Sequence, residues 1–225
     1  MSRLFITSSG TEIGKTFVTR ALVYQFRATG RKVAALKPVA SGFDDSAIEE
    51  TDTGELLNAL GRPLDAESVA AISPWRFAEP LSPDMAAARE GREIPFNELV
   101  AFCATDSGAD VTLIEGIGGV MVPLDDTHTV LEWIEAVGAP ALLVVGGYLG
   151  TLSHTLTAYE ALRSRTLEIA GIVVNESPEQ PVPLEETADA IRRFAGATPV
   201  VTLPRLADHS DAPNLLPLVA GPSSG

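Results

Sequence analysis

Short runs of apolar residues alternate along the chain with segments in which apolar residues recur every three or four positions. The first run, residues 4–6, leads through small residues into a segment with helical spacing at Val18, Ala21, Leu22 and Phe26. Five later apolar runs predict buried strands: residues 33–39, 111–115, 140–147, 169–174 and 199–204. Because strands and helices follow one another through short connections, the pattern predicts an α/β fold, a parallel β-sheet flanked by helices.

The remaining helical patterns lie between these strands. They cover residues 56–60, 84–89, 96–105, 129–137, 149–163 and 185–195. Residues 40–42 are small and predict a loop, and residues 61–83, rich in proline and turn formers, predict a long irregular connection. We detect no internal repeat. We expect a single domain over residues 1–220 and a disordered tail over residues 221–225.

A phosphate-binding loop is predicted between the first strand and the first helix. Gly14, Lys15 and Thr16 open the helix after a loop of small residues. In such a loop the lysine lies along the β- and γ-phosphates of a nucleotide and the threonine hydroxyl binds Mg²⁺. The match is imperfect, because Ser9 stands where the motif has glycine and Gly10 comes one residue late; the alternative is that these residues merely start a surface helix. Together with the alternating strands and helices, this loop favours a three-layer sandwich like that of P-loop NTPases.

Two further charged residues end predicted strands. Lys37 comes at the end of the second strand, and Glu115 follows the apolar residues 111–114. Ligands bind beyond the carboxyl ends of parallel strands, so both lie at the edge that carries the phosphate loop. Glu115 is predicted to reach Mg²⁺, although a carboxylate after a strand is commonly a helix cap or a surface residue. A second lysine beside the γ-phosphate indicates an acceptor that is itself anionic.

Composition narrows the classes of partner. The 225 residues carry a net charge of −14, which disfavours nucleic acid and anionic membranes as partners. The longest apolar run, residues 139–149, is too short to span a membrane. Cys103, the only cysteine, excludes an internal disulfide and suits a reducing compartment, so we expect a cytoplasmic protein. Cys103 is interpreted as buried packing rather than a catalytic thiol, and His154 as a packing or capping residue rather than a catalytic one.

Five segments together resemble the dethiobiotin synthetase family of the biotin pathway, in that family's order and over most of the chain. They are Thr11-Glu12-Ile13-Gly14-Lys15-Thr16, Lys37-Pro38-Val39-Ala40-Ser41-Gly42, Phe77-Ala78-Glu79-Pro80-Leu81-Ser82-Pro83, Glu115-Gly116-Ile117-Gly118-Gly119 and Leu149-Gly150-Thr151-Leu152-Ser153-His154. The second segment is the specific one, since the phosphate loop alone does not distinguish this family from its relatives.

The resemblance implies an ATP- and Mg²⁺-dependent ring closure. The substrate, 7,8-diaminononanoate, would take up CO₂ as a carbamate on one amine. The carbamate oxygen would attack the γ-phosphate of ATP, and the second amine would then close the cyclic urea of dethiobiotin and release phosphate. Lys15 would stabilise the transferring phosphoryl group, and Lys37 would hold the carbamate and the developing oxyanion.

The resemblance also implies the remaining site residues. The Mg²⁺ ligands would be Thr16, Asp52 and Glu115. The substrate would contact Thr11, Glu12, Lys37, Ser41, Gly150 and Ser153. The nucleotide would contact Glu12, Ile13, Gly14, Lys15, Thr16, Phe17, Asp52, Glu115, Gly116, Gly118, Asn175, Glu176, Pro204, Arg205 and Leu206, with Asn175 reading the adenine edge. The family is a homodimer, in which residues 150–153 reach the substrate of the neighbouring subunit.

The chain departs from the family pattern at a few positions. Ser8 replaces the first glycine of the loop, and Gly10 replaces a frequent aspartate. Ser153 replaces an asparagine that helps to hold the substrate carboxylate, and Glu176 replaces a frequent aspartate.

Three other functions remain as alternatives. A partitioning or metallochaperone-type ATPase switch would carry a lysine at Gly10 and give no reason for Lys37. A cobyrinate-type amide synthase would need a glutaminase domain, for which 225 residues leave no room. A non-catalytic nucleotide-binding module would not require both lysines.

Overall fold

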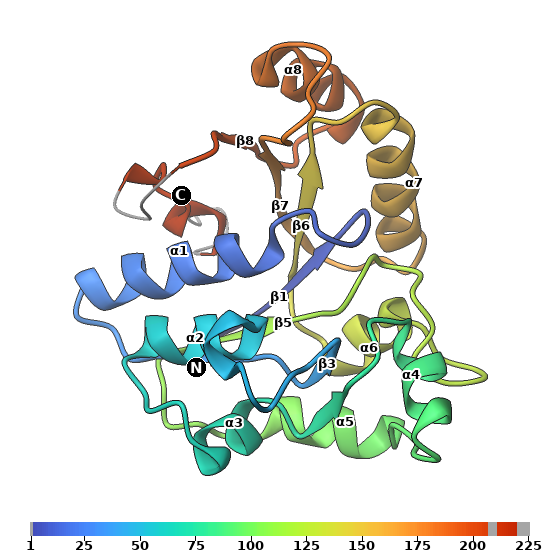
Figure 1. Ribbon diagram of the computed structural model, residues 1–225. Helices are drawn as coiled ribbons and strands as arrows, with labels where there is room; N and C mark the ends of the chain where they lie inside the picture. The colour runs from blue at the N-terminus through green and yellow to red at the C-terminus, as the bar shows by residue number, and fades with distance from the viewer. Residues whose placement is uncertain (1, 207–210, 220–225) are drawn as a thin grey trace.

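A six-stranded sheet forms the centre of the protein (Figure 1). The structure, a computed structural model, describes residues 2–206 and 211–219; the predicted tail, residues 221–225, lies outside them. The strands run in the order β2-β5-β1-β6-β7-β8, and every neighbouring pair is parallel. Their bounds are β1 (Ser2–Ser8), β2 (Val33–Leu36), β5 (Val111–Glu115), β6 (Ala141–Gly146), β7 (Ile169–Asn175) and β8 (Val200–Leu203). The predicted parallel α/β fold is confirmed.

Alternate side chains of the strands enter two separate cores, one on each face of the sheet. In β1, Leu4 and Ile6 pack against one layer of helices and Phe5 packs against the other. The ring of Phe5 meets Trp133 edge-on with ring centroids 4.8 Å apart. The first layer holds α1 (Lys15–Ala28), α2 (Asp52–Leu60) and α3 (Ala66–Ile72). The second holds α4 (Pro83–Arg89), α5 (Phe96–Ala104), α6 (Val130–Val137), α7 (Thr151–Ser164) and α8 (Leu184–Ala195).

The second predicted strand ends earlier than expected. β2 stops at Leu36, and residues 39–41, in part predicted as a loop, form a separate strand, β3 (Val39–Ser41). The break follows from Pro38, which has no N–H for a sheet ladder. The backbone of Lys37 turns away instead, and its N–H donates to the Ile72 carbonyl at 3.0 Å.

The predicted irregular connection, residues 61–83, is interrupted by two short regular elements. It contains α3 and the short strand β4 (Trp75–Phe77), which pairs with β3 in a second, two-stranded parallel sheet. Asp65 caps α3 by accepting from the Ser68 N–H at 2.8 Å. Pro74 directly precedes β4 and Pro83 is the first residue of α4, positions where proline is tolerated.

The other predicted helices are confirmed within a few residues. α7 begins at Thr151 rather than at 149, because Gly150 takes the left-handed conformation with φ 95°. Two short 3₁₀ turns, η1 (Ile48–Glu50) and η3 (Leu216–Leu218), complete the described elements. Next to η3, the side chain of Gln25 on α1 donates to the Pro213 carbonyl and accepts from the Leu215 N–H, both at 2.9 Å. Among the described residues, no helix has the length and apolar character needed to cross a bilayer.

Candidate active site

The loop between β1 and α1, residues 9–14, contains two positions in the left-handed region. Gly14 has φ 94° and Glu12 has φ 57°. A Cβ atom on Gly14 would lie 2.1 Å from the Nδ2 of Asn175, so only glycine fits there. α1 has no side-chain cap at its N-terminus. The positive end of the helix dipole therefore faces the loop, an arrangement that favours phosphate.

Lys15 is held by oxygen atoms on both sides of this loop. Its Nζ donates to the Gly118 carbonyl at 3.0 Å and to the Ser8 hydroxyl at 3.1 Å. The Ser8 hydroxyl, which has one hydrogen to donate, lies 2.5 Å from the Gly10 carbonyl oxygen and 2.8 Å from the Gly118 carbonyl oxygen. The serine that replaces the first loop glycine thus joins the phosphate loop to the glycines after β5. Burial and, next, the charge of Lys37 lower the pKa of Lys15 to about 8, although Glu115 and Asp52 oppose this shift.

Lys37 forms an ion pair with the buried carboxylate of Glu115 and another with Asp52, whose side chain is 51% exposed. Its Nζ lies 2.8 Å from Asp52 Oδ2, 2.8 Å from Glu115 Oε1 and 3.2 Å from the Gly116 carbonyl oxygen. Burial alone would lower the pKa of Lys37, but the charges of Glu115 and Asp52 raise it above the ordinary value. In return, the charge of Lys37 lowers the pKa of Asp52. Lys37 is 3% exposed and Glu115 is 0% exposed.

The oxygen atoms around Lys37 fit a magnesium ion. The Thr16 hydroxyl lies 2.8 Å from Asp52 Oδ1 and 2.8 Å from Glu115 Oε1. The second carboxylate oxygen of Glu115, Oε2, is buried and has no hydrogen-bond partner in the described structure. A buried carboxylate oxygen without a donor suits a cation, and one hydroxyl and two carboxylates are the hard oxygen ligands that Mg²⁺ accepts.

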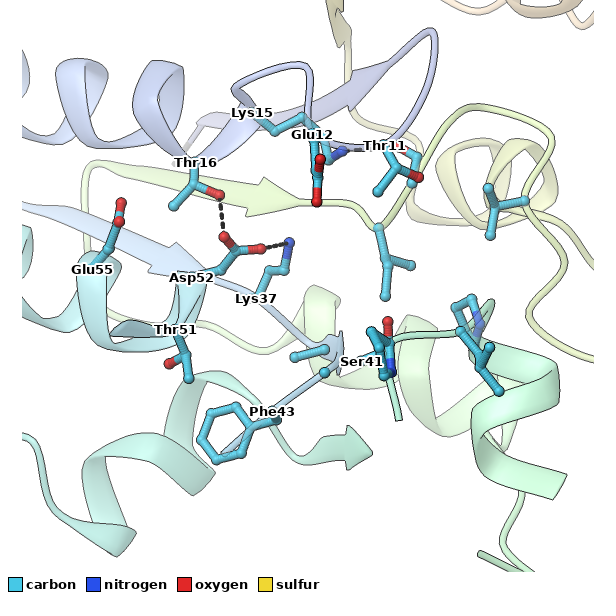
Figure 2. A pocket seen from close by; sticks show the side chains of 18 of the residues that line it. Thr11, Glu12, Lys15, Thr16, Lys37, Ser41, Phe43, Thr51, Asp52 and Glu55 are labelled. Atoms are coloured by element: carbon cyan, nitrogen blue, oxygen red, sulfur yellow. Dashed lines mark hydrogen bonds and ion pairs between the residues drawn. The ribbon is translucent and has the colours of Figure 1, made fainter. Parts of the chain in front are cut away.

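A cavity of about 890 Å³ opens over this cluster (Figure 2). Predicted site residues from four segments line it: Thr11, Glu12, Ile13, Gly14, Lys15, Thr16, Lys37, Ser41, Asp52 and Gly118. Figure 2 shows Thr16, Asp52 and Lys37 pointing toward one another from α1, α2 and the end of β2. The structure thus brings the phosphate loop, both lysines and the candidate metal ligands to one place.

Part of the cavity wall was not assigned residue by residue from the sequence. This part includes Phe43, Asp44, Thr51, Glu55, Pro80, Leu81, Ser82, Pro83, Ile117 and Val122, among others. Backbone hydrogen bonds hold its two sides together, from Gly42 N–H to the Glu79 carbonyl and from Phe43 N–H to the Phe77 carbonyl. Residues 80–83 belong to a segment that carried the family resemblance. That resemblance was the feature of the sequence from which this part of the cavity could have been predicted.

The remaining predicted residues lie outside this cavity. Asn175 Nδ2 donates to the Ile13 carbonyl at 2.9 Å, so it contacts the back of the phosphate loop. Glu176 Oε2 accepts from the Arg205 N–H at 2.8 Å, which holds the segment after β8 beside the end of β7. Gly150 is the residue before α7, and Ser153 is exposed on that helix. Glu115, Gly116, Phe17, Pro204 and Leu206 are likewise not in the lining.

His154 and Cys103, which the sequence analysis interpreted as non-catalytic, also lie outside the cavity lining. His154 is exposed, and its Nδ1 lies 2.8 Å from the Tyr148 hydroxyl. Cys103 is 0% exposed, and burial raises the pKa of its thiol to about 12. A buried thiol that stays protonated is a packing residue, as predicted, and not a nucleophile.

Known relatives match nearly the whole chain. The ATP-dependent dethiobiotin synthetase BioD of Acidiphilium cryptum strain JF-5 is 54% identical over 202 residues, which cover 88% of this chain and 91% of that protein. The BioD of Methylobacterium nodulans strain LMG 21967 is 50% identical, over 87% of this chain and 90% of that protein. The chain belongs to the dethiobiotin synthetase family. The resemblance read from its motifs is therefore confirmed, and the protein is an enzyme of this family.

Further comparisons concern the sequence and the fold. The BioD of Caulobacter vibrioides strain NA1000 is 45% identical over 97% of this chain and 99% of that protein. A protein-family model described as an AAA domain matches residues 2–212. The signal recognition particle receptor FtsY from Elizabethkingia anophelis in complex with GDP superposes with a TM-score of 0.53 at 15% identity. The match covers 97% of this chain but only 62% of that FtsY chain, so it supports the P-loop NTPase fold alone.

Proposed function

We propose that this dethiobiotin synthetase family member joins CO₂ to 7,8-diaminononanoate and closes the cyclic urea of dethiobiotin at the expense of ATP. The observation that carries the proposal is the convergence of Lys15, Lys37, Thr16 and Asp52 on one cavity beside Glu115. A nucleotide switch needs the phosphate loop and the metal ligands, but it has no use for the buried second lysine. An acceptor that is itself an anion does need it, because an oxyanion that approaches a polyphosphate must be neutralised.

The bound cation belongs to this proposal. Thr16, Asp52 and Glu115 would hold Mg²⁺, with a contribution from Glu115 Oε2, which has no hydrogen-bond partner among residues 2–206 and 211–219. When bound, the ion would neutralise charge on the β- and γ-phosphates. The α1 N-terminus and Lys15 would hold the same phosphates from the other side, with the loop main chain of Ile13 and Gly14 between them.

The reaction would proceed in three bond-forming steps. One amine of the substrate adds to CO₂ and loses a proton to give a carbamate. A carbamate oxygen then attacks the γ-phosphorus, the bond to ADP breaks, and a carbamic-phosphoric anhydride forms. The second amine attacks the anhydride carbon and loses a proton, which closes the ring and releases phosphate. Lys37 would hold the carbamate oxygen against the phosphoryl group, and Lys15 would stabilise the charge on the phosphoryl oxygens.

The cavity would accommodate the substrate between the phosphate loop and the 40–43 and 80–83 segments. Thr11, Glu12 and Ser41 line this cavity and would contact the substrate. Asn175, Glu176 and residues 204–206 lie at the ends of β7 and β8, where they would flank the adenine together with Phe17. Gly116 and Gly118 would leave room for the reacting groups beside the main chain.

An assay of phosphate release tests the proposed function. The protein is incubated with MgATP, with and without 7,8-diaminononanoate and bicarbonate, and the organic product is identified by its mass. We expect phosphate release that requires both co-substrates and matches dethiobiotin formation one to one. Hydrolysis that ignores both compounds would contradict the proposal and favour an ATPase switch.

We further propose that the enzyme is a cytoplasmic homodimer whose interface includes the start of α7. Leu149 is 86% exposed and Leu152 is 41% exposed, on either side of Gly150. Two exposed leucines on one turn suit an apolar contact. Sedimentation should give a dimer for the parent and a smaller species for Leu149→Asp, with activity lost in the variant. A parent that sediments as a monomer while it turns over substrate would refute the dimer.

The proposed location in the cytoplasm fits the free thiol of Cys103, which that compartment would keep reduced.

A further inference from the structure

Lys37 lies where the backbone leaves the main sheet. β2 stops at Leu36, and Pro38 has no N–H with which to continue the strand pairing. Both peptide groups of Lys37 therefore need partners outside the sheet. The C-terminal end of α3 supplies them. The Lys37 N–H donates to the Ile72 carbonyl at 3.0 Å, and the Ser73 hydroxyl donates to the Lys37 carbonyl at 2.6 Å.

A second buried hydroxyl extends this contact to α2. Thr53 Oγ1 lies 2.8 Å from Ser73 Oγ, and both side chains are 0% exposed. A serine hydroxyl has one hydrogen, which Ser73 gives to Lys37, so Thr53 is the donor in this pair. Thr53 directly follows Asp52, whose carboxylate lies 2.8 Å from the Lys37 ammonium. The main chain and the ammonium of Lys37 are thus tied to the same turn of α2 through a closed ring of contacts.

Packing alone does not require hydroxyl groups at these two positions. Alanine at position 73 and valine at position 53 would fill the same spaces. Alanine at position 73 would remove the donor to the buried Lys37 carbonyl, and valine at position 53 would remove the hydrogen bond that orients the Ser73 hydroxyl. The main chain of Lys37 would then be free to shift toward another partner. Such a shift moves the ammonium relative to the cavity, and a misplacement of about 1 Å can cost about 10²-fold in rate.

We propose that Ser73 is a positioning residue for Lys37 and that Thr53 orients the Ser73 hydroxyl. Neither side chain lines the cavity, so neither touches substrate or nucleotide there. The inference deepens the proposed function and rests on it, because it assumes that Lys37 acts in turnover.

A set of shape-matched variants tests this role by kinetics. Ser73→Ala and Thr53→Val remove the hydroxyls, and Thr53→Ser restores one. Thr112→Val is the matched control. Thr112 is also 0% exposed, and its hydroxyl lies 3.1 Å from the Ser107 hydroxyl. It pairs with Arg3 near the start of β1, at the other end of the strand from the site. We expect kcat to fall about tenfold or more in the first two variants, with KM for ATP changed less than about twofold. Thr53→Ser and Thr112→Val should keep the parental kcat.

A double variant shows whether the effect passes through Lys37. In a Lys37→Ala background, Ser73→Ala should cost less than about twofold further. A full, additive loss in the double variant would overturn the proposal, as would an unchanged kcat in Ser73→Ala or an equal loss in Thr112→Val. Should Ser73→Ala fail to fold, the isosteric pair Thr53→Val and Thr53→Ser gives the same comparison.

A spectroscopic measurement separates this inference from the proposed function. The chain has only three lysines, Lys15, Lys32 and Lys37. In protein labelled with ¹⁵N-lysine, the ammonium signal of Lys37 is assigned by its loss in Lys37→Ala. We expect this signal to shift or broaden in Ser73→Ala and Thr53→Val, to persist in Thr53→Ser, and the Lys15 signal to stay in place. An unmoved Lys37 signal in both hydroxyl-deleted variants would refute the positioning role. This spectrum needs no turnover, so it decides the matter even if no dethiobiotin forms.

Discussion

The two lysines of the site differ in the groups that surround their charges. Lys15 faces a carbonyl and a hydroxyl oxygen, which are neutral, and burial together with the charge of Lys37 lowers its pKa to about 8. Lys37 faces two carboxylates, which raise its pKa above the ordinary value although burial opposes them. Lys37 therefore stays cationic at neutral pH, as a group that holds an anionic acceptor must.

Removal of the Lys37 charge should affect turnover far more than nucleotide binding. Lys37→Ala is expected to lower kcat by about 10²-fold or more, the usual loss for one preorganised charge stabiliser. The Kd for ATP should change little, because the phosphate loop and Lys15 remain. Steady-state kinetics and equilibrium binding of a fluorescent ATP analogue measure the two effects. Lys32→Ala, at an exposed lysine, is the matched control. Equal turnover in Lys37→Ala would remove Lys37 from the mechanism.

In the nucleotide-free protein, the Lys37 ammonium should compete with a metal ion for the carboxylates of Asp52 and Glu115. The Lys37 ammonium lies 2.8 Å from carboxylate oxygens of both Asp52 and Glu115. Lys37→Met leaves these two negative charges without a counter-ion, so the affinity for Mn²⁺, used as a probe for Mg²⁺, should rise about tenfold or more. Paramagnetic resonance of free Mn²⁺ measures the affinity, with Lys32→Met as the control. Unchanged affinity would mean that the cation does not bind between these carboxylates.

At the scale of elements, the sequence pattern predicts strand ends to within a few residues, but not where the chain goes next. The apolar runs that carry Lys37 and Glu115 near their ends place both residues correctly at one edge, because parallel strands share that edge. The two-stranded sheet of β3 and β4 was missed. Its strands have only three residues each and lie far apart in sequence, so neither shows the alternation on which strand prediction depends.

Contacts between distant segments were also beyond prediction from the residues alone. The Asn175 side chain reaches the Ile13 carbonyl from β7, and Ser73 reaches the Lys37 carbonyl from the end of α3. No local periodicity encodes such pairs, because they depend on how the elements pack. The family resemblance marked Asn175 as a site residue, but it gave no indication of Ser73, which lies in the segment predicted as an irregular connection.

The phosphate loop should tolerate no side chain at Gly14. In Gly14→Ala the Cβ would meet the Asn175 amide, in addition to the strain of φ 94°. We expect ATP affinity to fall by about tenfold or more, because the loop must move from its phosphate-binding shape. Gly138→Ala is the matched control, since Gly138 has φ 65° with no heavy atom near its would-be Cβ. It should lose stability, about 1 to 2 kcal/mol, without a change in affinity. An equal affinity loss in both variants would show that general destabilisation is responsible.

At the scale of the whole molecule, the sheet separates two cores that serve different purposes. The core with α1 and α2 supports the phosphate loop and the turn that carries Asp52. The core with α5 and α6 lies behind the other face, where Cys103 and Trp133 pack. Ile117, Leu81 and Val122 belong to or pack against this second core and also line the cavity, whereas Cys103 and Trp133 do not line it. A change at Cys103 should therefore alter stability while the chemistry of the site stays intact.

Cys103 offers a direct test of this separation through pH. Burial raises the pKa of its thiol from 9.0 to about 12, so between these values the unfolded chain releases a proton that the folded protein retains. The free energy of unfolding should therefore fall as pH rises above about 9, by up to about 1.4 kcal/mol per pH unit from this group. Cys103→Ala loses packing at every pH, but its free energy of unfolding should decline less steeply with pH, by this amount.

Urea denaturation between about pH 8 and 11 measures the slope for both proteins, and the difference between the two slopes removes the contribution of other titrating groups. Parallel slopes would mean that the thiol ionises in the folded state. At neutral pH the variant should retain parental kcat, since the thiol lies in the second core.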